Sequence, residues 1–236
     1  MTNTANIPVF IPVRDRFSAL NQVVSWLEKA GHEEIWLIDN ASTYPPMIDY
    51  LESSPHNVIR LGWNLGHRAP WLWGAVQRVA SDRPYIVTDP DVLPTENCPL
   101  DAALYLLENL MRFDDIAKVG LGLKIDDLPA HYPLRDAVID WERKFWQVER
   151  MPGVYEADVD TTFAVYRPYS GLQAHHPCLR TGEPYTARHL PWYQDPSDLD
   201  EEDRYYREHA SLAVSNWDRD QVAAWKHRLG RGEETH

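Results

Sequence analysis

Residues 85–91 have the sequence Tyr-Ile-Val-Thr-Asp-Pro-Asp, in which a short apolar run ends in two carboxylates. The apolar run predicts a buried strand, and ligands of open α/β sheets bind at the carboxyl ends of the strands. Because side chains alternate along a strand, Asp89 and Asp91 are expected to point the same way, with Pro90 holding Asp89 extended. Two converging carboxylates suit Mg²⁺ or Mn²⁺ carrying a phosphate-bearing substrate. The alternative is a surface turn, since Asp and Pro are both common there.

The segments around this stretch alternate between strand and helix patterns. Apolar runs typical of buried strands lie at residues 7–13, 34–38, 57–61 and 85–88, and helical spacing of apolar residues lies at 17–30, 46–52 and 69–80. This alternation predicts βαβ units and a mostly parallel sheet in an α/β protein. The sequence has neither a G-x-G-x-x-G motif after the first strand nor a Walker A motif.

The second part of the chain has weaker patterns. Helices are expected at residues 99–113, 134–148 and 205–228, and strands at 117–124 and 161–166. The two glycines in 117–124 indicate close approach of another backbone or of a ligand. Residues 186–193 are expected to be irregular, and the acidic segment 195–203 is expected to be solvated.

The composition is that of an acidic globular protein. Lys and Arg total 23 against 36 Asp and Glu, and the net charge of −13 argues against a bulk nucleic-acid binder. No stretch approaches the roughly 20 apolar residues of a membrane span, and the first residues lack the pattern of a secretory signal. Cys98 and Cys178 match no metal-ligand spacing, which indicates free thiols in a reducing cytoplasm.

Four segments occur in an order and spacing that resemble a known family. They are IPVRDR after the first strand, IDNAST after the second, NLGHRAP after the third and TDPD after the fourth. Together they resemble the nucleotide-sugar half of family 2 glycosyltransferases with the GT-A fold. The resemblance covers about Ile7 to Pro94, and the later VDTTFAVYR and RHLPWY resemble a bacterial and viral GT-A subgroup. It implies one domain with a Rossmann-like, mostly parallel central sheet, in which residues 1–130 bind the donor and residues 131–236 bind the acceptor.

The resemblance also implies roles for single residues. Pro12, Arg14 and Asp15 would border the nucleobase and ribose, Asp39 would hydrogen-bond the uracil or ribose, Asn64, Gly66 and His67 would lie along the nucleotide, and Arg68 would lie near the diphosphate. Asp89 would contact ribose or metal, Asp91 would be the main metal ligand, and His189 would complete the metal shell. An imidazole in that shell favours Mn²⁺ over Mg²⁺.

Each of these residues also has an ordinary structural interpretation. Asp39 could cap the turn that follows it, and His189 could be one of several structural histidines. Arg14, Arg16 and Arg68 could be solvated surface charges, although a planar guanidinium suits phosphate and Arg68 is favoured over Arg16 for that role.

Asp158 and Asp160 are the candidates for a general base. A transferase that inverts configuration needs a group to accept the proton of the acceptor hydroxyl. The local sequence E-A-D-V-D-T-T differs from the usual E-D pair, so either aspartate could be the base, and Asp158 is the better candidate for a structural cap. If the enzyme retains configuration, Asp160 could instead position the donor sugar. Trp192, next to His189, is the candidate for stacking on a sugar.

The sequence therefore predicts a cytoplasmic, metal-dependent glycosyltransferase that uses a nucleotide sugar, most simply a UDP-sugar. Its acceptor could be a glycan, a lipid-linked intermediate, a small molecule or a hydroxylated base in DNA, for which the basic helix at 135–150 could follow phosphates. One alternative is a sugar-phosphate nucleotidyltransferase, which usually begins with a glycine-rich basic loop that is missing here. Another is a non-catalytic nucleotide-sugar-binding domain. The sequence names neither the sugar, the stereochemistry nor the oligomeric state.

Overall fold

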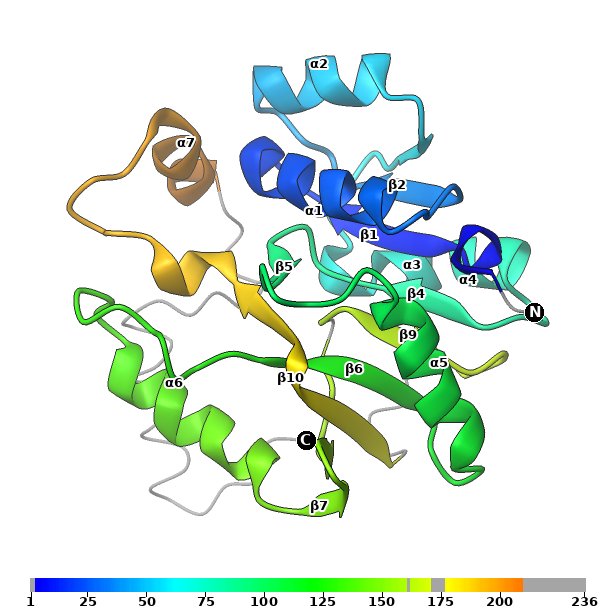
Figure 1. Cartoon of the computed structure of the whole chain (residues 1–236). Helices are drawn as coiled ribbons and strands as arrows, with labels where there is room; N and C mark the ends of the chain where they lie inside the picture. The colour runs from blue at the N-terminus through cyan, green and yellow to red at the C-terminus, as the bar shows by residue number, and fades with distance from the viewer. Residues whose placement is uncertain (1–2, 161, 171–176, 210–236) are drawn as a thin grey trace, which may run out of the picture.

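The computed structural model describes residues 3–160, 162–170 and 177–209, which form a ten-stranded mixed sheet flanked by helices (Figure 1). The strand order is β3-β2-β1-β4-β9-β6-β10-β8-β7, and β5 pairs with β10 off this path. The strands are β1 (Val9–Val13), β2 (Ile35–Asp39), β3 (Asn57–Arg60), β4 (Tyr85–Val87), β5 (Val92–Pro94), β6 (Lys118–Leu123), β7 (Glu149–Met151), β8 (Val154–Glu156), β9 (Ala164–Tyr166) and β10 (Cys178–His189).

The first four strands form the parallel part of the sheet. β1 lies between β2 and β4, and β2 pairs with β3, all in parallel register. β9 then runs antiparallel to both β4 and β6, while β6 and β10 are parallel. This arrangement confirms the predicted α/β fold class, a GT-A-like sheet whose parallel half is built from βαβ units. One sheet runs through both predicted halves, and their separate roles stay a prediction.

Helices cover both faces of the sheet, so that alternate side chains of β1 are buried on opposite sides. Val9 and Ile11 pack in one core with α1 (Phe17–Lys29), α2 (Pro45–Ser53) and α5 (Ala102–Arg112). Phe10 packs in a second core with α3 (Ala69–Leu72) and α4 (Ala75–Val79). Burial on both faces explains why β1 is a continuous apolar run rather than an alternating one.

Two predicted helices are shorter than expected. The helix expected at 69–80 is broken into α3 and α4, because Gly74 has a φ of +78°, a left-handed conformation that glycine adopts without steric cost. The helix expected at 134–148 ends as α6 (Arg135–Glu142) and continues as a short 3₁₀ segment, η3 (Arg143–Trp146). The other 3₁₀ segments are η1 (Thr4–Asn6), η2 (Gly66–Arg68) and η4 (Leu190–Tyr193).

Two expectations for the last part of the chain are wrong. Residues 186–189, expected to be irregular, end the long strand β10, which is held by pairing with β6, β5 and β8 on its two edges. The acidic segment is not wholly solvated, because α7 (Glu201–His209) begins there and Glu202 is buried. Residues 210–228 of the expected final helix lie outside the described residues.

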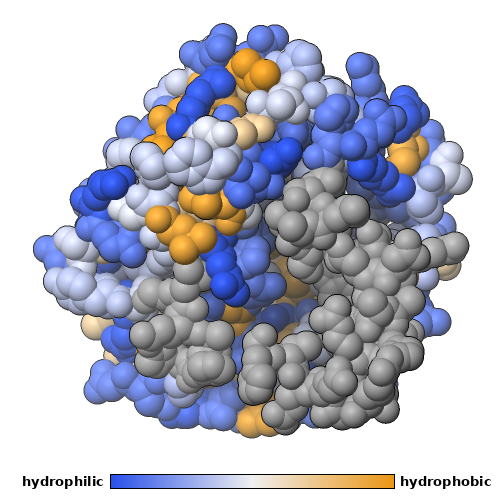
Figure 2. Space-filling view, turned by 180° about the vertical axis from the view of Figure 1, so that it is seen from behind, coloured by the Kyte–Doolittle hydropathy of each residue, from blue (hydrophilic) through white to orange (hydrophobic). Residues whose placement is uncertain are grey.

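The surface shows single apolar residues rather than a broad apolar face in the view of Figure 2, where hydrophobic residues form small groups among hydrophilic ones. Such scattered apolar residues are ordinary on a protein surface. Among the helices of the described residues, none has the length and apolar character needed to cross a membrane. Cys98 and Cys178 are both buried.

Candidate functional site

Asp91 and His189 meet at the carboxyl edge of the sheet because β5 and β10 pair there. Val92 of β5 is the antiparallel partner of His189 in β10, and the amide of Leu190 donates to the carbonyl of Asp91 at 2.8 Å. This pairing places His189 Nε2 at 3.7 Å from Asp91 Oδ1. The guanidinium of Arg16, which precedes α1, lies at 3.6 Å from Asp91 Oδ2. We call Asp91, His189 and Arg16 the edge cluster.

The surroundings of His189 favour a neutral imidazole. Burial lowers the pKa of His189, the charge of Asp91 opposes this effect, and the charge of Arg16 adds to it. Its Nδ1 is buried and has no hydrogen-bond partner among the described residues. Trp192 is also buried and packs edge-to-face against His189, with ring centroids 4.9 Å apart. Trp192 therefore packs against the imidazole and supports it. The sequence position of Trp192 had predicted an exposed ring that stacks on a sugar, and its burial rules out that role.

A neutral imidazole beside a carboxylate is a donor pair that a divalent cation can use. In the part of the chain that the structure describes, no three His, Cys, Asp or Glu side chains form a group that could hold a metal ion. The structure thus brings together Asp91 and His189, and the third ligand expected at Asp89 stays a prediction. Asp89 is half-buried at the end of β4.

The predicted nucleotide residues Asp15 and Asp39 both hold the loop after β2. Asp15 Oδ1 accepts hydrogen bonds from the amides of Thr43 and Tyr44 at 2.6 and 2.8 Å, and Asp39 Oδ1 accepts one from Ser42 at 2.9 Å. Both aspartates are buried. These bonds show the turn-capping role that Asp39 was given as its alternative, while contact with a nucleotide stays a prediction for both.

Asn40 joins the second and third predicted motifs, and the sequence did not single it out. Its Nδ2 donates to the carbonyl of Gly66 at 3.2 Å, and its Oδ1 accepts from the amide of Leu65 at 2.9 Å. Asn64 accepts from the amide of Gly66 at 2.8 Å within the same turn. The position of Asn40, a polar residue directly after β2, could have indicated a role at the site, because the carboxyl ends of neighbouring parallel strands share one edge of the sheet.

The remaining predicted residues lie along the same edge or next to it. Pro12 is buried in β1 opposite Ile38, and Arg14 Nη1 donates to the carbonyl of Asn40 at 3.3 Å. Burial lowers the pKa of His67, Asp160 opposes this effect and Arg68 adds to it. Asp160 also raises the pKa of His189 against the larger effect of burial. The exposed Asp160 therefore lies within electrostatic reach of both His67 and the edge cluster.

Helix α7 covers the side of this edge near α1 (Figure 1), an arrangement that the sequence did not predict. The carboxylate of Glu202 accepts hydrogen bonds from the amide of Ser18 at 3.0 and 3.1 Å. The hydroxyl of Tyr205 donates to Thr43 Oγ1 at 3.0 Å, and the Arg16 guanidinium lies 3.9 Å from the ring centre of Tyr206. A cavity of about 260 Å³ lies between α1, α7 and η4, with Arg16 in its lining.

Comparison with known proteins gives similarity to solved structures only. No family model and no curated protein matches the chain. A solved structure described as a mycobacterial protein aligns at 12% identity over 89% of this chain and 75% of its own, with a TM-score of 0.46. Glucosyl-3-phosphoglycerate synthase from Mycobacterium tuberculosis, in complex with Mn²⁺ and UDP-glucose, aligns at 15% identity over 69% of this chain, with a TM-score of 0.42.

A third solved structure, 4-diphosphocytidyl-2C-methyl-D-erythritol synthase from Anaerococcus prevotii, aligns at 10% identity over 94% of this chain and 85% of its own, with a TM-score of 0.35. The chain spans 56% of the length of the glucosyl-3-phosphoglycerate synthase. At these identities the likeness concerns the fold alone. The function proposed below therefore rests on the residues of this chain.

Proposed function

We propose that this protein is a metal-dependent glycosyltransferase that moves a sugar from a nucleotide-sugar donor, most simply a UDP-sugar, to an acceptor hydroxyl. The observation that carries this proposal is the edge cluster, in which Asp91 and His189 converge at 3.7 Å at the carboxyl edge of the parallel strands. The loops after β2 and β3, tied together by Asn40, lie along the same edge and supply a surface for the nucleotide.

The donor atoms of the edge cluster fit a Mn²⁺ or Mg²⁺ ion. Such ions often use one or two protein ligands and fill their remaining positions with water and substrate phosphates. Asp91 Oδ1 and His189 Nε2 would be the protein ligands, and Asp89 would be a third or would contact the ribose. When bound, the ion would neutralise negative charge that gathers on the leaving diphosphate. Imidazole ligation favours Mn²⁺.

The residues of the chain itself would orient the donor. Arg16 places a fixed positive charge beside the Asp91 carboxylate, where a diphosphate would also lie. Asp15 and Asp39 keep the loop at 42–44 in one conformation, so the groups that face the nucleobase are set before binding. Arg68 is exposed on η2 and is free to turn toward the diphosphate.

Asp160 is the better of the two base candidates. Its side chain is exposed, and its charge raises the pKa of both His67 and His189 against the larger effect of burial. Asp158 has a structural role through its backbone, because its carbonyl accepts a hydrogen bond from Arg180 Nε at 2.6 Å. In an inverting enzyme Asp160 would accept the proton of the acceptor hydroxyl, and in a retaining enzyme it would position the donor sugar.

A hydroxylated DNA base is disfavoured as the acceptor, because three of the four basic residues of the predicted phosphate-following helix have intramolecular partners. Lys144 Nζ lies 3.3 Å from the ring centre of Trp141, and Arg135 pairs with Asp136 at 3.3 Å. Arg150 pairs with acidic side chains of its own surroundings. A glycan or small molecule remains the favoured acceptor class.

A donor screen with an Asp91 variant tests the proposal. Nucleoside diphosphates with Mn²⁺ should raise the melting temperature, and one nucleotide sugar should be hydrolysed slowly in the presence of Mn²⁺. Asp91→Asn, which keeps the size of the side chain, should lose both effects, while Asp82→Asn, an exposed aspartate before β4, should keep them. Full Mn²⁺-dependent hydrolysis by Asp91→Asn, or no response of the native protein to any nucleoside diphosphate with Mn²⁺, would reject the proposal.

A further inference from the structure

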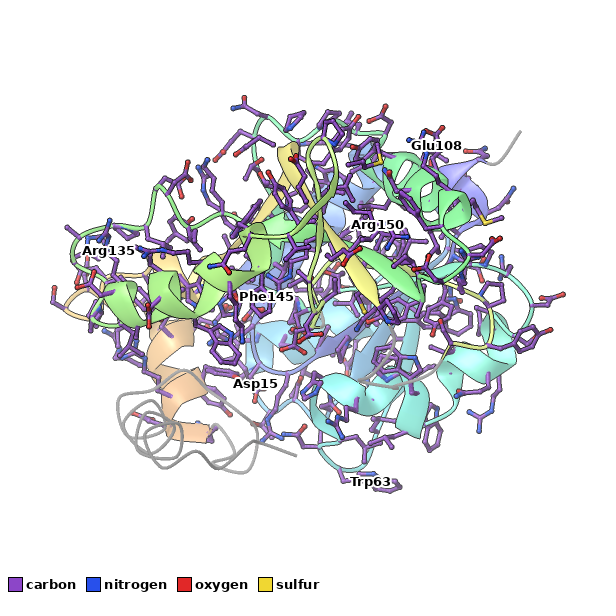
Figure 3. The ribbon with its side chains drawn as sticks, turned by 90° about the horizontal axis from the view of Figure 1, so that it is seen from below. Asp15, Trp63, Glu108, Arg135, Phe145 and Arg150 are labelled. Carbon is purple, nitrogen blue, oxygen red and sulfur yellow. The ribbon has the colours of Figure 1, made fainter. Side chains whose placement is uncertain are left out.

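A buried ion pair joins the second half of the sheet to α6. Arg180 of β10 and Glu142 of α6 expose 3% and 5% of their side chains, and Arg180 Nη1 donates to Glu142 Oε2 at 2.6 Å. The guanidinium also lies 4.1 Å from the ring centre of Phe145, which follows α6 in η3. Figure 3 labels Phe145 and also Arg150, which lies further along the chain in β7 and exposes 32% of its side chain.

A buried ion pair adds little net stability to a protein core. Apolar residues of similar volume often give the same or greater stability, because the desolvation of two charges offsets their attraction. Burial raises the pKa of Glu142, and the charge and hydrogen bond of Arg180 oppose that effect. The pair is therefore better explained by the geometry that it imposes than by net stability.

The guanidinium has a second directed bond that fixes a neighbouring loop. Arg180 Nε donates to the backbone carbonyl of Asp158 at 2.6 Å, while Nη1 holds Glu142. Two bonds from different nitrogens of one planar group set both its position and its orientation, which a lysine ammonium does not do. Glu142 therefore aims Arg180, and Arg180 holds the loop at Asp158.

Two further contacts fix the residues on either side of Asp158 in the loop that leads to Asp160. The amide of Ala157 donates to the carbonyl of Cys178 at 3.2 Å. Val159 is buried against β6, where a Cβ on Gly120 would lie 2.7 Å from Val159 Cγ1. The close approach predicted from the glycines of this strand is made at Gly120 by Val159, and at Gly122 by the carbonyl of Thr181 and the ring of Trp146. Residues 157–159 are held at three successive points, and the next residue is Asp160.

We propose that Arg180 and Glu142 are positioning residues that hold the loop at 157–159 and thereby set the position of Asp160. This inference rests on the proposed function, because Asp160 acts as a base or positions the donor sugar only if the protein is a glycosyltransferase. Arg180 and Glu142 touch neither substrate nor reacting atoms. Their effect reaches the reaction through the backbone of Asp158 and the packing of Val159.

The kinetic test separates turnover from donor binding. Arg180→Met should lower kcat by about 100-fold, the scale expected when a reacting group moves by about 1 Å, while the donor KM stays within about twofold because uniform binding is unchanged. Arg180→Lys and Glu142→Gln, which keep charge or shape, should lower kcat by about 10-fold each. These two conservative variants keep the test decisive if Arg180→Met does not fold.

Arg150 of β7 offers a control that is matched to Arg180 in residue type and in its kinds of partner. It pairs with Glu156 at 2.7 Å and with Asp115 at 3.3 Å, and its guanidinium lies 4.8 Å from the ring centre of Phe113. It thus has the same types of partner as Arg180, but it is more exposed, and these partners lie outside residues 157–159. Arg150→Met should keep kcat and KM. Equal losses in the Arg150 and Arg180 variants would show a general loss of stability and overturn the positioning role.

Hydrogen exchange supplies a readout that does not depend on activity. In Glu142→Gln and Arg180→Lys the Ala157 amide should exchange at least about 10-fold faster, while amides of β1 keep native protection. Unchanged exchange at Ala157, or unchanged kcat in an active protein, overturns the positioning role. If the native protein turns over no nucleotide sugar and binds no nucleoside diphosphate with Mn²⁺, the proposed function fails, and the Ala157 exchange still decides whether the ion pair holds the loop.

Discussion

Mild acid should destabilise the protein through His32, a buried histidine far from the edge cluster. The side chain exposes 3% of its area, and neither ring nitrogen makes a hydrogen bond of standard geometry within the described residues. Burial lowers the pKa of His32 to about 4 from the ordinary 6.5, and the nearby backbone of Ile7 opposes only part of this effect. The folded protein therefore keeps a neutral imidazole at pH values where the unfolded chain binds a proton.

The direction and size of the effect follow from this difference. Because the unfolded state binds the proton first, the free energy of unfolding falls as the pH drops below 6.5 and stops falling below about 4. At about 1.4 kcal/mol per pH unit, the loss approaches about 3 kcal/mol and reaches about 2.5 kcal/mol at pH 4.5. Above pH 6.5 the imidazole is neutral in both states, so the full stability is present.

Urea denaturation at pH 7.5 and pH 4.5 measures this loss. His32→Leu fills the apolar site without a titrating group, so its loss of stability between the two pH values should be smaller than that of the native protein by about 2.5 kcal/mol. His131→Gln, which removes an exposed histidine, is the control and should keep the native loss. The same loss in His32→Leu as in the native protein would refute the argument and assign acid sensitivity to other groups.

Two further variants test packing and capping. Gly122→Ala should lower the free energy of unfolding by about 1–3 kcal/mol, because its Cβ would lie 2.5 Å from the carbonyl oxygen of Thr181. In urea denaturation Gly62→Ala, with open space around it, should change little, and equal effects would contradict this reason. Glu202→Ala should cost about 1–2 kcal/mol by removing the acceptor for the Ser18 amide at the start of α1; unchanged stability in the same assay would show that α7 contributes nothing there.

The sequence predicts the parallel part of the sheet well because burial leaves a local pattern. The apolar runs that became β1, β2 and β4 are continuous since both faces are covered, and α1 lies within one residue of its expected bounds. The end of β10 was missed because its residues, which include Arg188, have little strand preference of their own. Pairing with β5 and β6 fixes their conformation, and such pairing partners are far apart in sequence.

The candidate site likewise combines residues that a local sequence pattern predicts and residues whose contacts depend on distant segments of the chain. Asp91 and Asp39 follow apolar strands, so their place at the sheet edge could be predicted from local pattern and from the family resemblance. The pair formed by Arg180 and Glu142 could not, because its members belong to elements that meet only in the folded chain. The contact of Glu202 with Ser18 was hidden for the same reason, and an acidic run gives no local sign of which carboxylate is buried.

The pairing of β5 with the end of β10 has a consequence for how this fold can change. Ala187, Arg188 and His189 lie opposite Pro94, Leu93 and Val92, so the chain leaves one short hydrogen-bonded ladder and returns to it. Insertions in the surface loops of the long excursion between the two strands would leave the meeting of Asp91 and His189 intact, whereas β6 within it is fixed by its own pairing with β10. A single-residue insertion within the ladder would turn His189 to the opposite face. The loops of the excursion can therefore diverge in length and sequence, while the three-residue ladder cannot shift by even one position.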